Sequence, residues 1–397
     1  MFKKFDNISK IALINFFSTL YFYLPILTIY YQQRNLNFVQ INSLLGIITA
    51  SIFFAEIPTG LLADKFGRKI SMVLALLFQL FGEIFFLFAT NYLHFILISI
   101  IAGIGFAFQS GCSQALVYDS LKEEGKEKEM KKTAGLIGAF YQAGHLVGAF
   151  ASSFIIFQLT KPRITLAIIM TIVSVGIAFL ITFLLKEPQS TYRHSEKNPI
   201  ELLKQSFSIM KNNLSLRRII LLGLVTTPFV GYLRNFQPPY FQLSHIPTMW
   251  LGISLGIAGI LAMLMSKYGY KLEKVLGVNA LFIGTLFPGI FYIFMSFIFS
   301  PFISGILFII NYGSMSLQEP FFADYYNIHI KSENRATTLS AINMFSSIYI
   351  ALMGLVIGSI ADVSLSYTFL FMAILIIVGS FLFKINKSHV EIMAKPE

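Results

Sequence analysis

The amino-acid sequence predicts an all-α membrane protein whose twelve transmembrane helices form two pseudo-symmetric six-helix bundles. Three observations predict it: the hydrophobic composition, the length of the apolar runs and a repeat that relates the two halves. Of the 397 residues, 56% are hydrophobic and 12% are charged, whereas a soluble domain carries about 25% charged residues. Many apolar runs reach the roughly 18 residues that a helix needs to cross the hydrocarbon core of a bilayer.

Polar turns divide the apolar sequence into twelve predicted spans. The first span is too long for a signal peptide and lacks a small-residue cleavage site, so it is expected to remain in the membrane. The predicted spans are 11–31, 38–62, 70–90, 92–118, 134–158, 164–185, 218–241, 248–268, 276–299, 301–323, 337–360 and 364–384.

Basic residues gather on one side of these spans. With the N-terminus inside, 26 of the 30 Lys and Arg residues lie on the cytoplasmic side, and the outer side has only Arg34, Lys161, Arg163 and Arg234. This bias follows the positive-inside rule, so both termini are expected in the cytoplasm. Topology and contact with anionic lipid explain the net charge of +11. A nucleic-acid partner is not expected, because no basic stripe alternates with exposed aromatic residues.

A polar stretch separates two halves of similar sequence. We expect residues 1–186 to form an N-terminal bundle, 187–217 a cytoplasmic linker and 218–397 a C-terminal bundle. Within the linker, Asn198, Pro199 and Glu201 have the pattern of a helix start. Apolar residues follow at helical spacing, which predicts an amphipathic helix on the inner membrane face, with a disordered linker as the alternative.

The repeat has an offset of about 203 residues. "LADKFGRK" (62–69) aligns with "LMSKYGYK" (264–271), Pro25 aligns with Pro228, and Asp119 aligns with Asp324. Parallel six-helix repeats are a known way to build a transporter, with its substrate site between the halves at mid-membrane.

The turn between spans 2 and 3 carries the motif G-x-x-x-D-[RK]-x-G-[RK]-[RK], formed by Gly60, Asp64, Lys65, Gly67, Arg68 and Lys69. With the twelve spans and the degenerate second copy, the sequence resembles the major facilitator superfamily over nearly its whole length. It resembles twelve-span bacterial antiporters that exchange drugs or metabolites for protons. The resemblance implies a monomeric carrier of the bacterial inner membrane, not an enzyme, that uses the proton gradient and no cofactor.

The motif predicts a conformational switch. Gly67 suits a tight turn, Gly60 would let a neighbouring helix approach, and Asp64 would accept hydrogen bonds at the start of span 11. Arg68 is expected to bridge to Asp119 when the halves close on the cytoplasmic side. The alternative is that the basic residues serve only as topology anchors. The predicted switch residues are Gly60, Asp64, Gly67, Arg68, Asp119 and Arg335.

Two signatures of drug exporters are incomplete. Span 4 has Ser99 where exporters have an Arg four residues before Gly103, and span 5 has His145 and Ala149 in place of Pro and Gly. These departures weaken the exporter interpretation. A small-residue face that would let span 5 pack tightly is still present at Gly138, Gly144 and Gly148.

Ionisable groups inside a membrane are costly and suggest function. The candidates for proton coupling are Glu56, Glu83, His145, Glu319 and Asp324. Glu56 is the strongest, since it lies about 12 Å deeper than the motif aspartate; Glu319 and Asp324 could instead be gate residues, and His145 a packing residue. No His or acid cluster has ligand spacing, so no metal is expected, and the single Cys112 excludes an intrachain disulfide.

Soft and aromatic residues are expected to line the solute pathway. The substrate-binding candidates are Tyr23, Gln142, Tyr232, Arg234, Phe236 and Asn343. The alternative for Arg234 is that it extends to the outer interface. Such a lining suits an amphipathic or aromatic solute.

The favoured function is proton-coupled efflux of a hydrophobic or amphipathic drug or metabolite by alternating access. The alternative within transport is proton-coupled uptake of a small organic nutrient, which the incomplete span 5 signature favours. From another class, a membrane sensor or a lipid-handling enzyme is the alternative. The expected partners are a small-molecule substrate, protons and membrane lipids. ATP is not expected as the energy source, because the sequence has no Walker phosphate loop.

Overall fold

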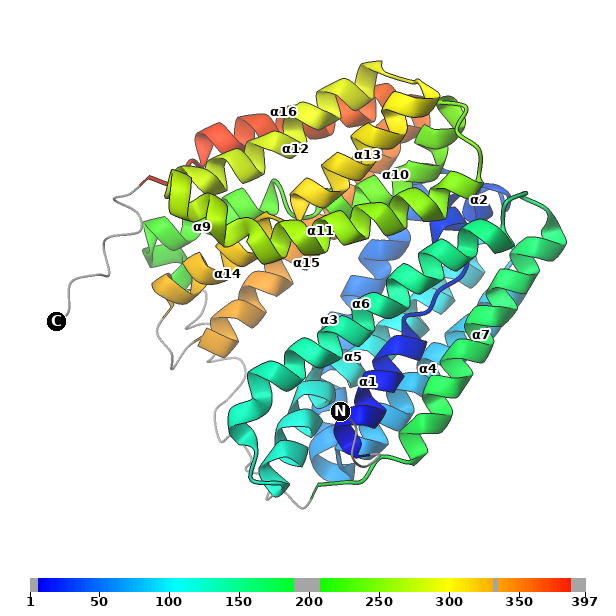
Figure 1. Ribbon diagram of the computed structural model, residues 1–397, viewed down its shortest axis with the longest axis vertical. Coiled ribbons are helices and arrows are strands. Elements are labelled where there is room, and N and C mark those ends of the chain that lie inside the picture. Colours follow the sequence, from blue (N-terminus) through cyan, green and yellow to red (C-terminus); the bar gives the residue numbers. More distant parts are fainter. Residues whose placement is uncertain (1–5, 189–207, 331–334, 387–397) are drawn as a thin grey trace. The chain divides into compact units, whose positions relative to one another are not determined.

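A computed structural model of the protein describes residues 6–188, 208–330 and 335–386. All regular elements within these ranges are helices and none is a strand, which confirms the predicted all-α class (Figure 1). The helices are α1 (Asn7–Ser18), η1 (Leu24–Ile26), α2 (Leu27–Gln32), α3 (Phe38–Phe66), α4 (Arg68–Phe88), α5 (Tyr92–Glu123), η2 (Glu127–Glu129), α6 (Met130–Ile155), α7 (Lys161–Phe183), α9 (Leu214–Leu224), α10 (Phe229–Leu243), α11 (Met249–Leu276), α12 (Asn279–Phe297), α13 (Pro301–Met315), α14 (Gln318–His329), α15 (Arg335–Val363) and α16 (Leu365–Leu382).

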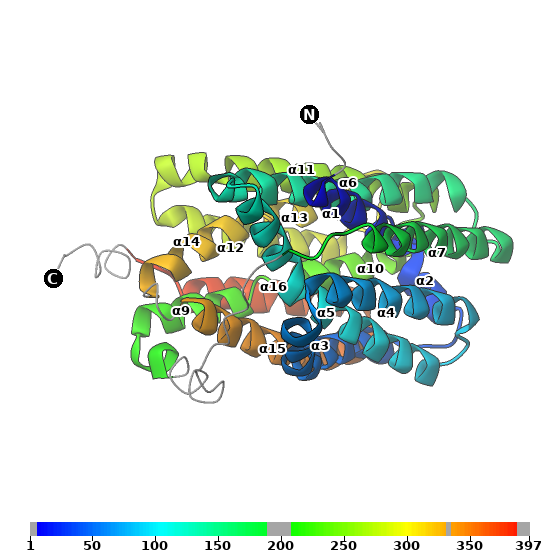
Figure 2. The same ribbon diagram turned by 90° about the horizontal axis from the view of Figure 1, so that it is seen from below.

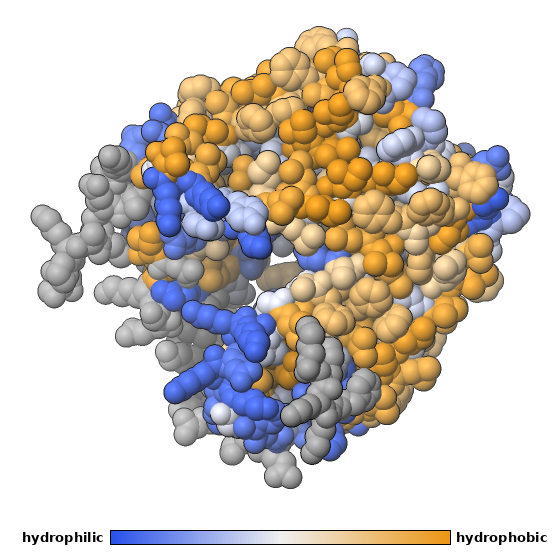
Figure 3. Space-filling view, viewed as in Figure 1, coloured by the Kyte–Doolittle hydropathy of each residue, from blue (hydrophilic) through white to orange (hydrophobic). Residues whose placement is uncertain are grey.

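Each of the twelve predicted spans coincides with helical structure. In the described part of the chain, nine helices are long and apolar enough to cross a membrane, with α9 and α10 counted together. The other three predicted spans are α1 with η1 and α2, α6, and α13 with α14. Figure 3 shows hydrophobic residues over the visible sides of α7, α11 and α13, and hydrophilic residues where α5 ends and α6 begins.

Spans 1 and 7 are interrupted at corresponding places. In span 1, α1 ends at Ser18 and Pro25 lies in the short helix η1 that follows the break. In span 7, α9 ends at Leu224 and Pro228 is the N-cap of α10. Proline has no backbone N–H and clashes with the preceding helical turn, so it ends a helix or opens a new one. The prolines that the sequence repeat aligns therefore occupy equivalent structural positions.

The chain divides into two compact units. The first comprises Met1–His194 with Thr248–Gly256, and the second comprises Ser195–Pro247 with Ile257–Glu397. Equivalent helices pack in each unit: α4, from span 3, packs against α7, from span 6, while α12 packs against α16, from spans 9 and 12 (Figure 2). The predicted boundaries at 186 and 218 remain a prediction. The start and most of the predicted amphipathic linker helix lie outside the described residues.

A buried core cluster of the first unit joins α4 and α5 with α1 and α7. Met72 and Leu76 of α4 pack against Phe108, Cys112 and Leu116 of α5. Phe108, Cys112 and Leu116 are spaced four residues apart, so they share one face of α5. The cysteine is 2% exposed and its thiol donates a hydrogen bond to the carbonyl oxygen of Phe108.

Glycines let the helices of the first unit approach closely. A Cβ on Gly148 of α6 would lie 2.7 Å from the carbonyl oxygen of Tyr21. A Cβ on Gly144 would overlap Phe16 of α1 and Thr19, the residue that follows this helix, whereas one on Gly138 would meet no described atom within 4 Å. The predicted small-residue face therefore packs at two of its three glycines. Through Gly148, it supports the backbone at the break in span 1.

Gly148→Ala is expected to lower the thermal stability of the protein. The neighbour of the added methyl group is backbone, which cannot rotate away, and overpacking of this kind costs about 1–3 kcal/mol. Gly135→Ala is the matched control, because Gly135 lies in the same helix and a Cβ there would meet no described atom within 4 Å. Melting of both purified variants in detergent checks this; equal melting temperatures would contradict the packing argument.

Candidate functional site

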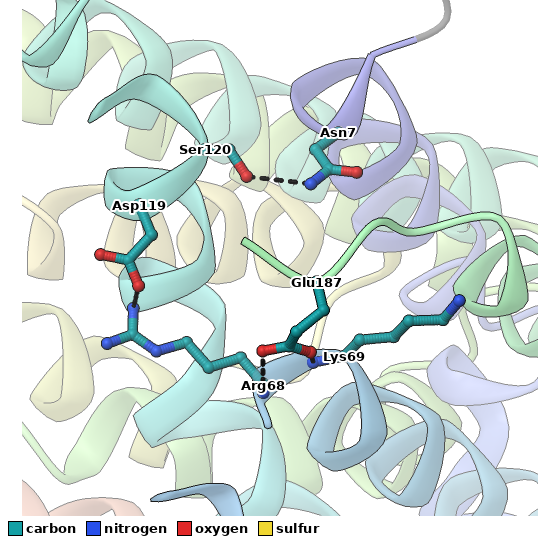
Figure 4. A network of polar contacts seen from close by, with 6 residues as sticks. All are labelled: Asn7, Arg68, Lys69, Asp119, Ser120 and Glu187. Atoms are coloured by element: carbon teal, nitrogen blue, oxygen red, sulfur yellow. Dashed lines mark hydrogen bonds and ion pairs between the residues drawn. The ribbon is translucent and has the colours of Figure 1, made fainter. Parts of the chain in front are cut away.

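The turn between α3 and α4 is built around Gly67 and the carboxylate of Glu187 (Figure 4). Glu187, which follows α7, accepts hydrogen bonds from the backbone N–H groups of Arg68 and Lys69, each 2.7 Å long. A carboxylate at a helix N-terminus satisfies unpaired N–H groups and matches the helix dipole. Gly67 has φ +96°, and a Cβ there would lie 2.7 Å from the Glu187 carboxyl carbon. Glycine is required at this position both by the backbone angle and by the space that the carboxylate occupies.

The predicted ion pair between Arg68 and Asp119 is present (Figure 4). Asp119, near the end of α5, is 6% exposed. The same end of the unit holds Asn7, whose Nδ2 donates to Ser120 Oγ at 3.0 Å. Asn7 also exchanges two hydrogen bonds of 2.9 Å with the backbone of Lys186. These contacts join the ends of α1, α4 and α5 to the segment that follows α7.

This network lies within the first unit. The ion pair of Arg68 therefore connects two helices of the same half and does not by itself join the halves. Asp64 is exposed, and a Cβ on Gly60 would meet no described atom within 4 Å. Arg335 is the first residue of α15, in the second unit. The role of these residues as a conformational switch remains a prediction.

A buried carboxyl group lies farther along α4. Glu83 is 8% exposed, and the hydroxyl of Tyr23 donates a hydrogen bond of 2.7 Å to its Oε2. The Tyr21 hydroxyl lies within hydrogen-bonding reach of the same carboxyl and accepts a bond of 3.0 Å from Gln79 Nε2. Tyr23 also stacks on Phe86, with ring centroids 4.7 Å apart. Glu83 thus sits in a polar cluster enclosed by aromatic rings.

The break in span 1 makes this cluster possible. Side chains two residues apart on a continuous helix do not share a face. Because α1 ends at Ser18 and η1 begins only at Leu24, Tyr21 and Tyr23 are freed from helical geometry and both reach Glu83. Among the described residues, no Lys, Arg or His forms an ion pair with this carboxyl group.

Two cavities meet beside Glu83, both within the first unit. The smaller, about 40 Å³, is lined by Glu83, Tyr21 and Gln79 among others, and we name it the Glu83 chamber. Its volume is about that of a single water molecule. The larger, about 490 Å³, is lined by residues of α1, α3, α5 and α6, and we name it the first-unit cavity. Phe106 and Gln109 line both, so they form the boundary between them.

The other proton-coupling candidates are less buried than Glu83. Glu56, Glu319 and Asp324 are exposed, on α3 and α14. His145 on α6 is half-buried, and its ring packs edge-on against Tyr141 with centroids 4.8 Å apart. Glu83 is therefore the candidate carboxyl group that the fold removes most completely from solvent.

The substrate-binding candidates are distributed over both units. Tyr23 belongs to the Glu83 cluster, and Gln142 of α6 and Asn343 of α15 are exposed. In the second unit, Tyr232 and Phe236 of α10 are buried, with the Tyr232 hydroxyl bonded to the Ile350 carbonyl and Phe236 packed against Phe369. Arg234 is half-buried. Two of the six residues lie in the first unit and four in the second, and their contact with a solute remains a prediction.

Sequence reasoning missed three groups that the fold places at these sites. Glu187 looked like the first residue of a polar linker, and only the folded chain shows that it caps α4. Gln79 and Gln109 are uncharged, so they are not among the ionisable groups that the sequence places inside the membrane. The sequence signal for these two residues is a side-chain amide inside an apolar span, because a polar group within a membrane needs a hydrogen-bonding partner.

Within 6–188, 208–330 and 335–386, no group of three or more His, Cys, Asp or Glu side chains could hold a metal ion. The polar clusters described above are held by hydrogen bonds.

Comparison with protein families gives a match over most of the chain. The sequence model described as "Major Facilitator Superfamily" matches residues 11–353. Among curated proteins, an uncharacterised MFS-type transporter of Bacillus subtilis (strain 168), YxaM, is 22% identical over 258 residues. The match covers 64% of this chain and 63% of that protein, so it spans less than two thirds of the relative.

Solved structures of transporters share the fold. The nucleoside transporter NupG is 14% identical with a TM-score of 0.77, covering 95% of this chain and 98% of that one. A bacterial homologue of the human lysosomal transporter Spinster is 14% identical with a TM-score of 0.76, and the match covers 97% of this chain and 96% of that one. A D-xylose–proton symporter is 13% identical with a TM-score of 0.70, covering 95% of each chain. At these identities the similarity concerns the fold alone.

Proposed function

This chain belongs to the Major Facilitator Superfamily, and from that premise we propose that it couples solute movement to proton movement through Glu83. Members of this family are secondary transporters and carriers, so the chain is a membrane transporter and not an enzyme. The alternatives of a membrane sensor and a lipid-handling enzyme are therefore set aside. The solute, the coupling ion and the direction belong to the proposal.

The observation that carries the proposal is the environment of Glu83. Its carboxyl group is buried, receives a hydrogen bond from Tyr23, and has no basic partner among the described residues. An ionised carboxylate without a counter-charge is costly to bury. Proton uptake removes that cost when the site is closed, and proton release requires the site to open to water. A carboxyl group in this environment links its protonation to the conformation of the transporter.

The two cavities supply a route for the proton. The Glu83 chamber has room for one water molecule and shares Gln109 with the first-unit cavity. The tyrosine hydroxyls and the Gln109 amide can both donate and accept hydrogen bonds. A chain of tyrosine hydroxyls and water supports proton exchange between Glu83 and the cavity, with the Gln109 amide orienting the water by hydrogen bonds. Proton and solute would then meet in the same unit.

Efflux is the direction that the resemblance to twelve-span antiporters predicts. Uptake by symport is the second candidate, because span 5 lacks the proline and the last glycine of the exporter signature. Among proteins of the same fold, the printed names include a nucleoside transporter and a D-xylose–proton symporter. We also propose a monomer in the bacterial inner membrane with both termini in the cytoplasm. The 26 basic residues on one side support this orientation of the termini.

Transport in proteoliposomes under an imposed pH gradient tests the function. The purified full chain is reconstituted with a pH-sensitive dye inside, and a panel of labelled neutral, cationic and anionic solutes is supplied. We expect one solute class to accumulate against its own gradient while the dye reports a proton flux. The side on which the solute accumulates separates symport from antiport. Accumulation that persists after a protonophore removes the gradient would exclude proton coupling.

A further inference from the structure

The first-unit cavity is lined by uncharged groups only. Its 13 lining residues are Asn15, Ile52, Phe106, Gln109, Ser110, Ser113, Gln114, Val117, Met130, Ala134, Ile137, Gly138 and Tyr141. They include three side-chain amides, two serine hydroxyls and one phenol, and none is acidic or basic. The volume of about 490 Å³ lies within the range of 300–1,000 Å³ found for small-molecule sites.

One face of α5 supplies most of the polar groups. Gln109 and Ser113 are four residues apart, as are Ser110 and Gln114, so all four lie on one side of the helix. The other side, with Phe108, Cys112 and Leu116, packs in the core. Polar residues in a membrane-spanning segment avoid lipid and face a protein interior or a cavity. The arrangement of α5 therefore directs its amides and hydroxyls to the cavity.

Several of these side chains remain available to a ligand. Within the described part of the chain, the side chains of Gln109, Ser113 and Gln114 form no hydrogen bond to another protein group. Asn15 uses one N–H on the carbonyl oxygen of Ile11, at 2.9 Å, which leaves its amide oxygen as an acceptor. An amide presents both donors and an acceptor. The cavity can therefore match a solute that carries hydroxyl or amide groups.

We propose that the first-unit cavity binds the transported solute, and that this solute is an uncharged molecule with several hydroxyl or amide groups. A charged solute would lose its hydration without a counter-charge from the lining, which is costly. A purely apolar solute would leave the three amides without partners, which is also costly. Phe106, Ile137 and Tyr141 supply apolar surface for the carbon skeleton. The inference rests on the proposed transport function and narrows its substrate class.

Binding to the purified full chain in detergent, without any gradient, tests the inference. The probes are D-glucose and uridine as neutral polar solutes, tetraphenylphosphonium as a cation, benzoate as an anion and toluene as an apolar solute. A ligand of the folded state raises the melting temperature. We expect at least one neutral polar probe to raise it at millimolar concentration and the other three probes to leave it unchanged.

Gln114→Leu tests whether the cavity is the site. The variant removes the amide but keeps a side chain of similar size, and we expect about tenfold weaker binding of the neutral probe. Gln158→Leu is the matched control, because Gln158 is exposed in the turn between α6 and α7; it should bind as the unmodified chain does. If Gln114→Leu does not fold, Ser113→Ala replaces it, and we then expect a smaller loss of affinity for the neutral probe.

The outcomes separate this inference from the proposed function. Binding of a charged or apolar probe in place of the neutral ones, binding of none, or unchanged binding in Gln114→Leu would overturn the inference. Suppose that a neutral probe binds, that this binding is lost in Gln114→Leu, and that transport does not depend on the proton gradient. That result would support the cavity as the solute site and refute coupling through Glu83.

Discussion

Replacing Glu83 with Gln is expected to abolish solute accumulation driven by a proton gradient while exchange of solute across the membrane continues. Glutamine keeps the size of the side chain and can still accept the hydrogen bond from Tyr23, but it cannot take up or release a proton. The variant should therefore behave permanently like the protonated carrier. In proteoliposomes, we expect the accumulation ratio to fall to about one and the exchange rate to stay within about threefold of the unmodified chain.

Three further substitutions make this result specific. Glu127→Gln is the matched control, because Glu127 is exposed in the 3₁₀ turn η2 that precedes α6; it should accumulate solute normally. Glu56→Gln tests the candidate that the sequence favoured because of its depth within predicted span 2. This variant should also accumulate solute normally, since Glu56 is exposed. Tyr23→Phe removes the hydrogen bond but keeps the ring on Phe86, and partial loss is expected. Loss in Glu56→Gln with normal coupling in Glu83→Gln would refute the assignment.

Gly67→Ala is expected to lower the free energy of unfolding by about 2 kcal/mol. Two causes act together at this position. An alanine at φ +96° is strained, and its Cβ would lie 2.7 Å from the carboxyl carbon of Glu187. That carboxylate caps α4 through two backbone N–H groups, so moving it away leaves the helix start without its partner. The melting temperature in detergent, measured with and without the substitution, gives the effect.

A double-mutant cycle separates the two causes. Glu187→Ala alone loses the cap, a loss of about 1 kcal/mol. In the double variant Gly67→Ala with Glu187→Ala, the steric overlap is gone, and the losses that remain are the backbone strain and the missing cap. The combined loss should therefore be smaller than the sum of the single losses. Strict additivity would show that the carboxylate does not restrict this position, and an unchanged melting temperature in Gly67→Ala would contradict both causes.

The sequence predicted the features that depend on local pattern. Each predicted span falls on helical structure, and nine helices of the described residues are long and apolar enough to cross a membrane. The motif between spans 2 and 3 predicted the ion pair of Arg68 with Asp119. The repeat aligned Pro25 with Pro228, although it did not show that each lies at a helix break. These features follow from hydropathy, charge and turn chemistry, which neighbouring residues determine.

Features that depend on tertiary contact escaped prediction. The sequence ranked Glu56 above Glu83 by depth along a helix, but depth does not show which side of the helix faces the protein interior. Glu83 is buried because the broken span 1 brings Tyr23 to it, across 60 residues of sequence. In the same way, Glu187 reaches Arg68 across 119 residues. No local pattern contains either contact.

The single cysteine has a practical consequence for measuring motion. Cys112 is packed between α4 and α5, and its thiol is bonded to the Phe108 carbonyl. A thiol so enclosed is inert to water-borne alkylating reagents. Pairs of new surface cysteines can therefore carry spin labels or fluorophores without prior removal of the native one. Distances between such labels then test the proposed alternating access in a chain that keeps its native cysteine.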